Sequence, residues 1–580
     1  MRAPEVKHFP AEGFDSQDID LLHEMRVYYT GLYERQIEME DGTSRSYKAY
    51  IPETASYGDE SVYIAVPDDV NTAEFLTRSG WIELAEQEKN AVILCVFEPR
   101  NQKWGDEEQE VEYIRKVYMD MTFEENGLHS FIFPGVFNWR WIGYGSGAEM
   151  ILRYAFENPM DFASLVAVDG CSKIREETLN KAGETCFVNS SGHRYSEWPN
   201  KKIPVPVWLI GAENEAVVKY WRTANDCTLE RTELPFGYRY DQDPLSPNLM
   251  TFDQKVGQVR VTTVVPDYTD DSFTGRAFRF LHAFSRSGKN SPYANMLYPT
   301  AEDSRFRRET VIVDDMEREW YVYLPSSYTG KEPMPLVIYF HGRGQTGLVA
   351  MRQGGWWNCG ERKNFITVCP TGSLSGREKG QIPFVVWKTG MPIWSDRTWQ
   401  KDDHCETENR FIRQMLGELT REYNIDKSRM YICGQSNGGR MTQMMAEKGA
   451  DLFAAAASTG APSVVAQTSL PLFICGGEYD LVPANLTEDD QIADERIADA
   501  LRKRLQARGI DYEKRGLFRS GIFTNMVWSD EQGIPVCRFC SVRHQAHSWR
   551  QNMASTIWDE WFCRFTRNPE TDRIEYMHRG

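Results

Sequence analysis

An internal repeat constrains the fold of this chain more than any other feature of its sequence. Six landmarks occur in the same order in each half of the 580 residues. They are a short strand that ends in proline, two apolar strands, an acidic lead-in to an amphipathic helix, a strand–turn–helix, and a strand with an acidic turn. In the first half they occupy residues 49–52, 61–66, 91–97, 104–116, 141–150 and 208–215, and in the second half residues 322–325, 335–340, 365–370, 399–414, 432–441 and 473–480.

Short apolar strands that alternate with helical segments are typical of an α/β fold with a mostly parallel sheet. We therefore predict two tandem α/β domains, each with a mostly parallel sheet flanked by helices. The polar stretch at residues 285–293 is the best boundary signal, and it predicts one domain at 1–290 and a second at 300–580.

Composition and charge exclude several classes of protein. With 41% hydrophobic and 13% aromatic residues, the chain is too apolar to be disordered. Its net charge of −18 argues against nucleic acid or an anionic membrane as a partner, because both bind basic surfaces. The longest apolar runs fall well short of the about 20 residues that a membrane helix needs.

The expected location is the cytoplasm. The N-terminal residues contain no apolar segment of the kind that a secretory signal requires. Cys95, Cys433 and Cys475 lie in apolar strand-like runs, where buried reduced thiols are usual. Cys537 and Cys540 form a single C-x-x-C pair without a second pair at zinc spacing, and we interpret them as residues of a strand rather than as metal ligands.

Ser436 is the candidate nucleophile. It lies in Gly-Gln-Ser-Asn-Gly at residues 434–438, between an apolar strand and a helix. A nucleophile on such a tight turn is held in a strained conformation that only small neighbours permit, so its oxygen projects from the sheet. The alternative is a serine that cradles a phosphate or only stabilises a turn.

An acid and a histidine follow Ser436 in the order that a Ser-His-Asp triad requires. Asp480 comes just after an apolar strand, at the sheet edge where catalytic loops gather. His547 follows another strand and precedes the closing helix. Glu478 is the competing acid and His544 the rival base, and both fit better at strand ends. By the roles of a Ser-His-Asp triad, we expect His547 to act as general base and acid, and Asp480 to orient and stabilise its imidazolium.

The backbone N–H groups of Arg343 and Asn437 are candidates for an oxyanion hole. Asn437 directly follows the candidate nucleophile, and Arg343 lies in a Phe-His-Gly-Arg-Gly-Gln loop after an apolar strand, where such enzymes supply their second donor. Glycine in that loop lets the backbone approach the substrate closely. We expect His341 to hold the loop rather than to transfer protons.

These motifs resemble those of the polyhydroxybutyrate-depolymerase and feruloyl-esterase group of α/β-hydrolases. The matching pieces are L-V-I-Y-F-H-G-R-G-Q, Y-N-I-D-K-S-R-M-Y-I-C-G-Q-S-N-G-G-R-M, G-G-E-Y-D-L-V-P and A-H-S-W, and the resemblance covers residues 305–567. It implies an α/β-hydrolase fold and a serine carboxylic-ester hydrolase that acts through an acyl-serine intermediate, without a metal or an organic cofactor. The family usually has proline after the tryptophan of the last motif, where this chain has Arg550.

Tryptophans near these motifs predict an aromatic-lined cleft. Trp387, Trp394 and Trp399 crowd one segment, and Trp549 lies two residues after His547. Such a cleft suits a small or oligomeric ester substrate, either with a feruloyl-type aromatic acyl group or from a polyester. The alternative is that these tryptophans belong to the core.

We interpret the first half as a degenerate, inactive α/β-hydrolase-like domain. Gly145 aligns with the candidate nucleophile, and Ser146 could replace it only if Tyr144 were tolerated where a small residue is required. Glu215 aligns with the candidate acid, but the His-Gly loop is missing, and no histidine occurs at the position of the base before His282. Fold alone does not give function.

Two other functions stay open. A serine peptidase or amidase uses the same triad, and a non-catalytic scaffold or binding protein would have two inert hydrolase-like halves. The sequence also leaves open whether the chain forms a homo-oligomer.

Overall fold

The protein is described by a computed structural model of residues 4–9, 27, 29–87, 92–122, 127–132, 139–189, 192–251, 255–287, 292, 295–375, 384–389 and 403–577. These residues form two compact units, and the boundary between them in the sequence lies between Thr300 and Ala301. No helix in these ranges combines the length and the apolar character that crossing a membrane requires.

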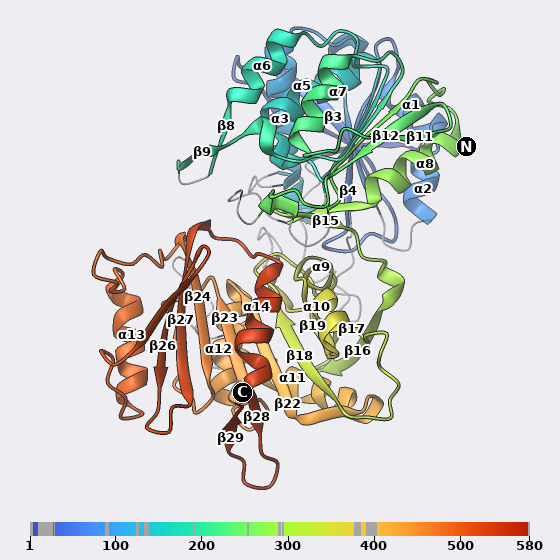
Figure 1. Cartoon of the computed structure of the whole chain (residues 1–580). Coiled ribbons are helices and arrows are strands. Elements are labelled where there is room, and N and C mark those ends of the chain that lie inside the picture. Colours follow the sequence, from blue (N-terminus) through green and yellow to red (C-terminus); the bar gives the residue numbers. More distant parts are fainter. Residues whose placement is uncertain are drawn as a thin grey trace. The chain divides into compact units, whose positions relative to one another are not determined.

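Each unit is built around one large sheet (Figure 1). In the first unit the strand order is β1 (Val6–Phe9), β2 (Gly31–Glu38), β3 (Ser44–Ile51), β5 (Ile93–Phe97), β4 (Ser61–Ala65), β6 (Trp139–Tyr144), β7 (Ser164–Val168), β10 (Val207–Ile210), β13 (Gln258–Thr262), β12 (Gly237–Asp241) and β11 (Thr232–Leu234). In the second unit it is β16 (Phe306–Val313), β17 (Met316–Tyr323), β19 (Ile366–Pro370), β18 (Met334–Phe340), β22 (Ile425–Gln435), β23 (Ala455–Thr459), β24 (Leu472–Tyr479), β27 (Pro535–Ala546), β26 (Phe523–Ser529) and β25 (Gly516–Ser520).

The two sheets have the same strand order, apart from β1 at the edge of the first. The central strands run parallel in both units, and the two strands next to them on either side are antiparallel. The predicted α/β fold with two mostly parallel sheets is confirmed. The pairing also shows which residues of the two units correspond. Ala65 pairs with Gly143 in the first unit and Phe340 pairs with Gly434 in the second, so Ala65 corresponds to Phe340 and Gly143 to Gly434.

Helices cover both faces of each sheet. In the first unit they are α1 (Thr72–Arg78), α2 (Trp81–Gln87), α3 (Glu107–Thr122), α4 (His129–Ile132), α5 (Ser146–Glu157), α6 (Glu176–Glu184), α7 (Glu215–Ala224) and α8 (Asp271–His282). In the second they are α9 (Gly347–Gln353), α10 (Trp356–Lys363), α11 (Asp403–Glu422), α12 (Asn437–Lys448), α13 (Glu495–Gln506) and α14 (Asn552–Glu560).

Alternate residues of β18 show how the second sheet is buried on both faces. Ile338 belongs to a core cluster with Phe411 of α11 and Met441 of α12. Its neighbour Tyr339 belongs to a separate cluster with Trp558 of α14. Successive strand residues point to opposite faces, so β18 is apolar throughout, as expected for a central parallel strand.

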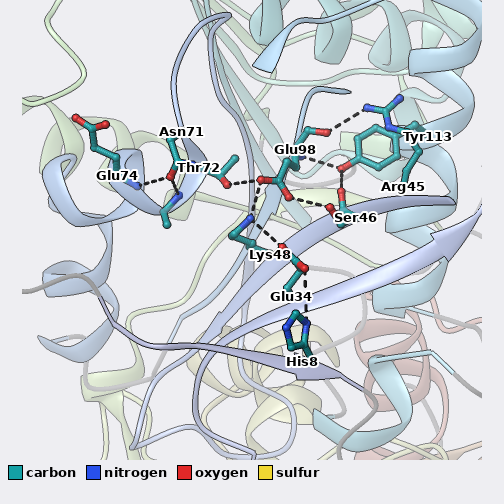
Figure 2. Close-up of polar contacts among 11 residues, drawn as sticks. His8, Glu34, Arg45, Ser46, Lys48, Asn71, Thr72, Glu74, Glu98 and Tyr113 are labelled. Carbon is teal, nitrogen blue, oxygen red and sulfur yellow. Dashed lines mark hydrogen bonds and ion pairs between the residues drawn. The ribbon is translucent and has the colours of Figure 1, made fainter. Parts of the chain in front are cut away.

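A buried ion pair in the first unit joins the start of β3 to α3. The Arg45 guanidinium donates to Glu110 of α3 at 3.0 Å and to the backbone oxygen of Glu98, just after β5, at 3.1 Å. It also stacks 3.8 Å from the ring centre of Tyr113, one turn along α3. Figure 2 shows Arg45 beside Tyr113, and the Glu98 carboxylate accepting hydrogen bonds from Ser46, Lys48 and Thr72.

The second unit repeats this ion pair at the matched positions. Arg318 of β17 donates to Glu408 of α11 at 2.9 Å and to the backbone oxygen of Thr371, just after β19, at 3.2 Å. It stacks 4.0 Å from the ring centre of Phe411, one turn along α11. Because an arginine, a glutamate and an aromatic ring recur in the same geometry, the repeat extends from strand order to the details of the core.

Candidate active site

Ser436 lies at the sharp turn between β22 and α12. Its backbone has φ 59° and ψ −117°, in the left-handed region that side chains other than glycine rarely adopt. Its N–H donates to the oxygen of Thr459 at 2.8 Å, which ties the turn to the end of β23. A side chain at Gly438 would overlap the backbone oxygen of Phe340, so the last glycine of the motif is needed for the turn to pack against β18.

The structure brings Ser436, His547 and Asp480 into one chain of hydrogen bonds. His547 Nδ1 donates to Asp480 Oδ1 at 2.6 Å, and His547 Nε2 accepts from Ser436 Oγ at 2.7 Å. The Asp480 side chain is 2% exposed and that of His547 23% exposed, so the acid is shielded while the base remains accessible. The serine hydroxyl therefore has its proton acceptor in place.

The environment of His547 favours its protonated form. Burial acts to lower its pKa, but the charge and the hydrogen bond of Asp480 outweigh burial, so the pKa is raised above the ordinary 6.5. The Arg440 guanidinium acts in the opposite direction, with a smaller effect. An imidazole with a raised pKa accepts a proton more readily, as a general base must.

His341 holds the loop that follows β18. Its Nδ1 lies 2.7 Å from the Gly342 oxygen, which can only accept, and its Nε2 accepts from the Gly372 N–H at 2.9 Å. Burial lowers its pKa to about 4, which fits a neutral ring with these two roles. Arg343 lies on this loop with an exposed side chain, and Asn437 is the first residue of α12. First-turn amides of a helix have no partner within the helix, so the Asn437 N–H suits an oxyanion donor.

Trp387 does not lie where the sequence led us to expect it. Its side chain is 0% exposed, so it cannot contact a substrate in this structure. It instead links the two predicted oxyanion elements, because its indole N–H donates to the His341 oxygen at 3.1 Å and its backbone N–H donates to Asn437 Oδ1 at 2.6 Å. The reason for the difference is that β20 (Ser373–Ser375) and β21 (Phe384–Val386) form a hairpin that carries the segment after it into the core.

Of the other three tryptophans predicted to bind substrate, the structure describes Trp549. Trp549 is half-buried, donates its indole N–H to the Gly354 oxygen at 2.9 Å, and lies two residues beyond His547. Its contact with substrate stays a prediction. Trp394 and Trp399 lie outside the described residues.

Glu478 and His544, the rival acid and base, contact each other rather than Ser436. The Glu478 carboxylate accepts a hydrogen bond from the His544 backbone N–H at 2.8 Å. Gly460 is a residue at the site that the sequence analysis missed. It has φ 64°, and a side chain there would lie 3.3 Å from His547 Cε1 and 3.3 Å from the Ser436 nitrogen. The available signal was a glycine directly after a short apolar strand.

The first unit has the same turn without the same groups. Gly145, between β6 and α5, has φ 53° and ψ −125°, and its N–H donates to the Val168 oxygen at 2.8 Å. The Asp68 N–H, at the position of the Arg343 N–H, donates to the Ser146 hydroxyl at 3.1 Å. Asp169, which has φ 55°, takes the position of Gly460 after β7.

Comparisons with known proteins match parts of the chain. A model of the prolyl oligopeptidase family matches residues 412–472, which include the turn at Ser436. A bifunctional acetylxylan esterase/xylanase from Neocallimastix patriciarum is 27% identical over 167 residues, 28% of this chain and 21% of that protein. A poly(3-hydroxyalkanoate) depolymerase C from Paucimonas lemoignei is 30% identical over 158 residues, 27% of this chain and 34% of that protein. The chain thus covers about a fifth and a third of the length of these two relatives.

Among solved structures, an acetyl xylan esterase from Aspergillus awamori is 16% identical and matches 44% of this chain and 98% of its own, with a TM-score of 0.33. Over slightly more than a quarter of its length, the chain is similar in sequence to the Neocallimastix esterase/xylanase and to the Paucimonas depolymerase, in agreement with the resemblance carried by its motifs.

Proposed function

We propose that the second unit is a serine carboxylic-ester hydrolase with Ser436 as nucleophile, His547 as general base and acid, and Asp480 as the orienting acid. The observation that carries the proposal is the continuous chain of hydrogen bonds from Asp480 through His547 to Ser436. The partial matches to esterases and a depolymerase support ester hydrolysis in particular.

The geometry suits a two-step reaction. As Ser436 Oγ attacks the ester carbonyl, its proton passes to His547 Nε2, and Asp480 stabilises the imidazolium that forms. The oxyanion of the tetrahedral intermediate accepts hydrogen bonds from the N–H groups of Arg343 and Asn437. His547 then gives its proton to the leaving alcohol, which leaves an acyl group on Ser436. Water, activated by the same histidine, releases the acid.

The proposed substrate is an ester with a feruloyl-type aromatic acyl group or an ester unit of a polyester, small or oligomeric. Two relatives are named as an acetylxylan esterase and a poly(3-hydroxyalkanoate) depolymerase, which supports an ester of a polymeric substrate. The half-buried ring of Trp549, two residues beyond His547 in the sequence, supports an apolar wall for the acyl group. A screen of methyl ferulate, short acyl esters and hydroxyalkanoate oligomers would rank these substrates.

The first unit, corresponding to the domain at 1–290, is proposed to be an inactive copy of the domain at 300–580. Gly145 has no side chain that could attack an ester. The Asp68 N–H, which an oxyanion would need as a donor, already donates a hydrogen bond to the Ser146 hydroxyl. Asp169 adds a carboxylate at the position of Gly460. A cytoplasmic location is proposed because all twelve cysteines are free thiols, which suits a reducing compartment.

The test is turnover of p-nitrophenyl acetate by the full chain and its Ser436→Ala variant. Removal of a serine nucleophile typically lowers kcat by about a millionfold. We expect the variant to lose turnover while its circular dichroism and melting temperature stay close to those of the wild type. Turnover by Ser436→Ala at the wild-type rate would contradict the assignment.

A serine peptidase is the second candidate, because a model of the prolyl oligopeptidase family matches residues 412–472. The triad is chemically able to cleave an amide as well as an ester. Matched acetyl ester and anilide substrates separate the two functions. We expect the ester to be cleaved far faster, and a preference for the anilide would replace the esterase proposal by the peptidase one.

A further inference from the structure

The strand that leads to His547 contains an irregularity that is absent from the matched pair of described strands in the first unit, β10 and β13. β24 and β27 pair without interruption from Leu472 with Cys537 to Gly477 with Val542. The next pair is Tyr479 with Ala546. Between these two pairs β24 advances by two residues while β27 advances by four. The matched strands β10 and β13 pair without such a shift and end at Thr262, the counterpart of Cys540.

Two extra residues in one strand make a bulge, which bends the strand and changes the direction of the side chains that follow. His544 lies in the middle of this bulge, between Val542 and Ala546, with φ 59°. A residue other than glycine adopts this conformation only where surrounding contacts stabilise it. His547 is the third residue after His544, so the shape of the bulge determines where its ring lies.

Residues of β24 hold the bulge, and among them the Tyr479 hydroxyl lies 3.4 Å from His544 Nδ1. The Glu478 carboxylate accepts the His544 backbone N–H at 2.8 Å, which satisfies a donor that the strand pairing leaves out. Gly477 packs so closely that a side chain there would overlap the Gln545 oxygen. Within the loop, the Gln545 side-chain amide donates to the Ser548 oxygen at 2.8 Å, on the far side of His547.

Glu478 precedes Asp480 by two residues, so one strand end carries both the acid that pairs with the His547 ring and the acid that holds the His547 loop. We infer that Glu478 is a positioning residue, which keeps His547 between Ser436 and Asp480 by fixing the left-handed conformation of His544. The inference rests on the proposed function. It assigns no proton transfer to Glu478, and its role depends on an oxygen acceptor rather than on a negative charge.

The test compares four variants of the full chain in p-nitrophenyl acetate turnover. Misplacement of a catalytic group by about 1 Å can cost roughly a hundredfold in rate. We expect Glu478→Ala to lower kcat by about tenfold to a hundredfold with KM nearly unchanged, because the loop rather than the substrate site is disturbed. Glu478→Gln retains an oxygen acceptor, and its kcat should stay within about threefold of the wild type.

His544→Gly supplies the second arm of the test. Glycine adopts positive φ without strain, so His544→Gly alone should be nearly as active as the wild type. In the double variant with Glu478→Ala, we expect most of the lost kcat to return, because the bulge no longer needs the carboxylate. His544→Val should lower kcat although Glu478 is intact, since a β-branched residue is strongly disfavoured at this φ.

A kcat of Glu478→Ala equal to that of the wild type would overturn the inference, as would equal losses in Glu478→Gln and Glu478→Ala. No recovery in the double variant would also overturn it. If Glu478→Ala does not fold, His544→Val and His544→Gly decide the matter, and equal activity of these two contradicts the inference. Failure of the proposed function looks different, since the wild-type chain itself would then show no ester turnover and no labelling of Ser436 by a fluorophosphonate.

Discussion

At the turn between strand and helix, Gly145 of the first unit has φ 53° and ψ −125°, and Ser436 of the second has φ 59° and ψ −117°. Each donates its N–H to the last residue of the next strand at 2.8 Å. The first unit therefore has the same backbone turn, with glycine in the place of Ser436. Glycine adopts this conformation without strain, whereas serine is strained in it.

The same contrast recurs around the turn. At the position that corresponds to Arg343, the Asp68 N–H of the first unit donates to the Ser146 hydroxyl. At the position of Gly460, where a Cβ would lie 3.3 Å from His547 Cε1, the first unit has Asp169. The buried arginine–glutamate pair, by contrast, is present in both units with nearly the same distances. The buried ion pair is thus common to both units, while the hydrogen-bond chain of Ser436, His547 and Asp480 belongs to the second.

After removal of Ser436 itself, the largest expected effect comes from replacing the acid, Asp480. Replacement of the aspartate by asparagine in a Ser-His-Asp triad lowers kcat by about 10⁴, and we expect a similar loss for Asp480→Asn. Glu215→Gln, at the matched position of the first unit, should leave kcat unchanged. Steady-state turnover of p-nitrophenyl acetate measures both, and a comparable loss in the two variants would break the comparison between the units.

The pH dependence of kcat/KM tests the same contact. His547 must be neutral to accept a proton, so activity rises with pH through its pKa, which Asp480 raises above 6.5. Without the carboxylate the effect of burial remains and lowers the pKa. The midpoint of the acid limb should therefore lie above pH 6.5 in the wild type and move to lower pH in the residual activity of Asp480→Asn. A midpoint that moves upward would contradict this account of the histidine.

The buried ion pairs predict a loss of stability in both units. The Arg318 and Glu408 side chains are 1% and 0% exposed, and those of Arg45 and Glu110 are 6% and 3% exposed. Removal of one partner of such a pair typically costs about 3–5 kcal/mol, because the other charge stays buried without compensation. Urea unfolding of Arg318→Met and Arg45→Met should show losses of this size. Apolar replacement of both partners should restore much of the stability.

A smaller effect is expected at Gly460. Its φ of 64° disfavours any other residue, and a Cβ would lie 3.3 Å from His547 Cε1. Gly509 is the matched control, because it has φ 69° but a Cβ there would have nothing within 4 Å. Each alanine variant should lose about 1 kcal/mol of stability, but only Gly460→Ala should also lower kcat, by about tenfold. Equal kcat values for the two variants would contradict the prediction that a side chain at residue 460 presses on the His547 ring.

The smallest expected effect comes from Ser146→Ala. This change frees the Asp68 N–H from the serine hydroxyl, but it restores neither a nucleophile nor a histidine. Ester turnover of the full chain should therefore stay within about twofold of the wild type, because only one neutral hydrogen bond is lost, with a net contribution of about 1 kcal/mol. A gain of turnover that persists in a Ser436→Ala background would show that the first unit is active.

Local patterns predicted most of the fold and the candidate triad. The order of apolar strands and the turn at Ser436 are encoded in short segments, so the α/β fold and the elbow could be identified from the sequence. The burial of Trp387 could not, because it depends on a hairpin that brings it between His341 and Asn437. The bulge at His544 was likewise missed, because it arises from pairing between β24 and β27, whose paired residues Tyr479 and Ala546 are 67 residues apart in the sequence.

The most direct test of the central claim is to label the full chain with a fluorophosphonate and to locate the label by peptide mass spectrometry. We expect one label per chain, on the peptide that contains Ser436, and no label in Ser436→Ala. A label on the peptide that contains Ser146, or a wild-type chain that takes no label at Ser436, would contradict the claim that the second unit alone carries the chemistry.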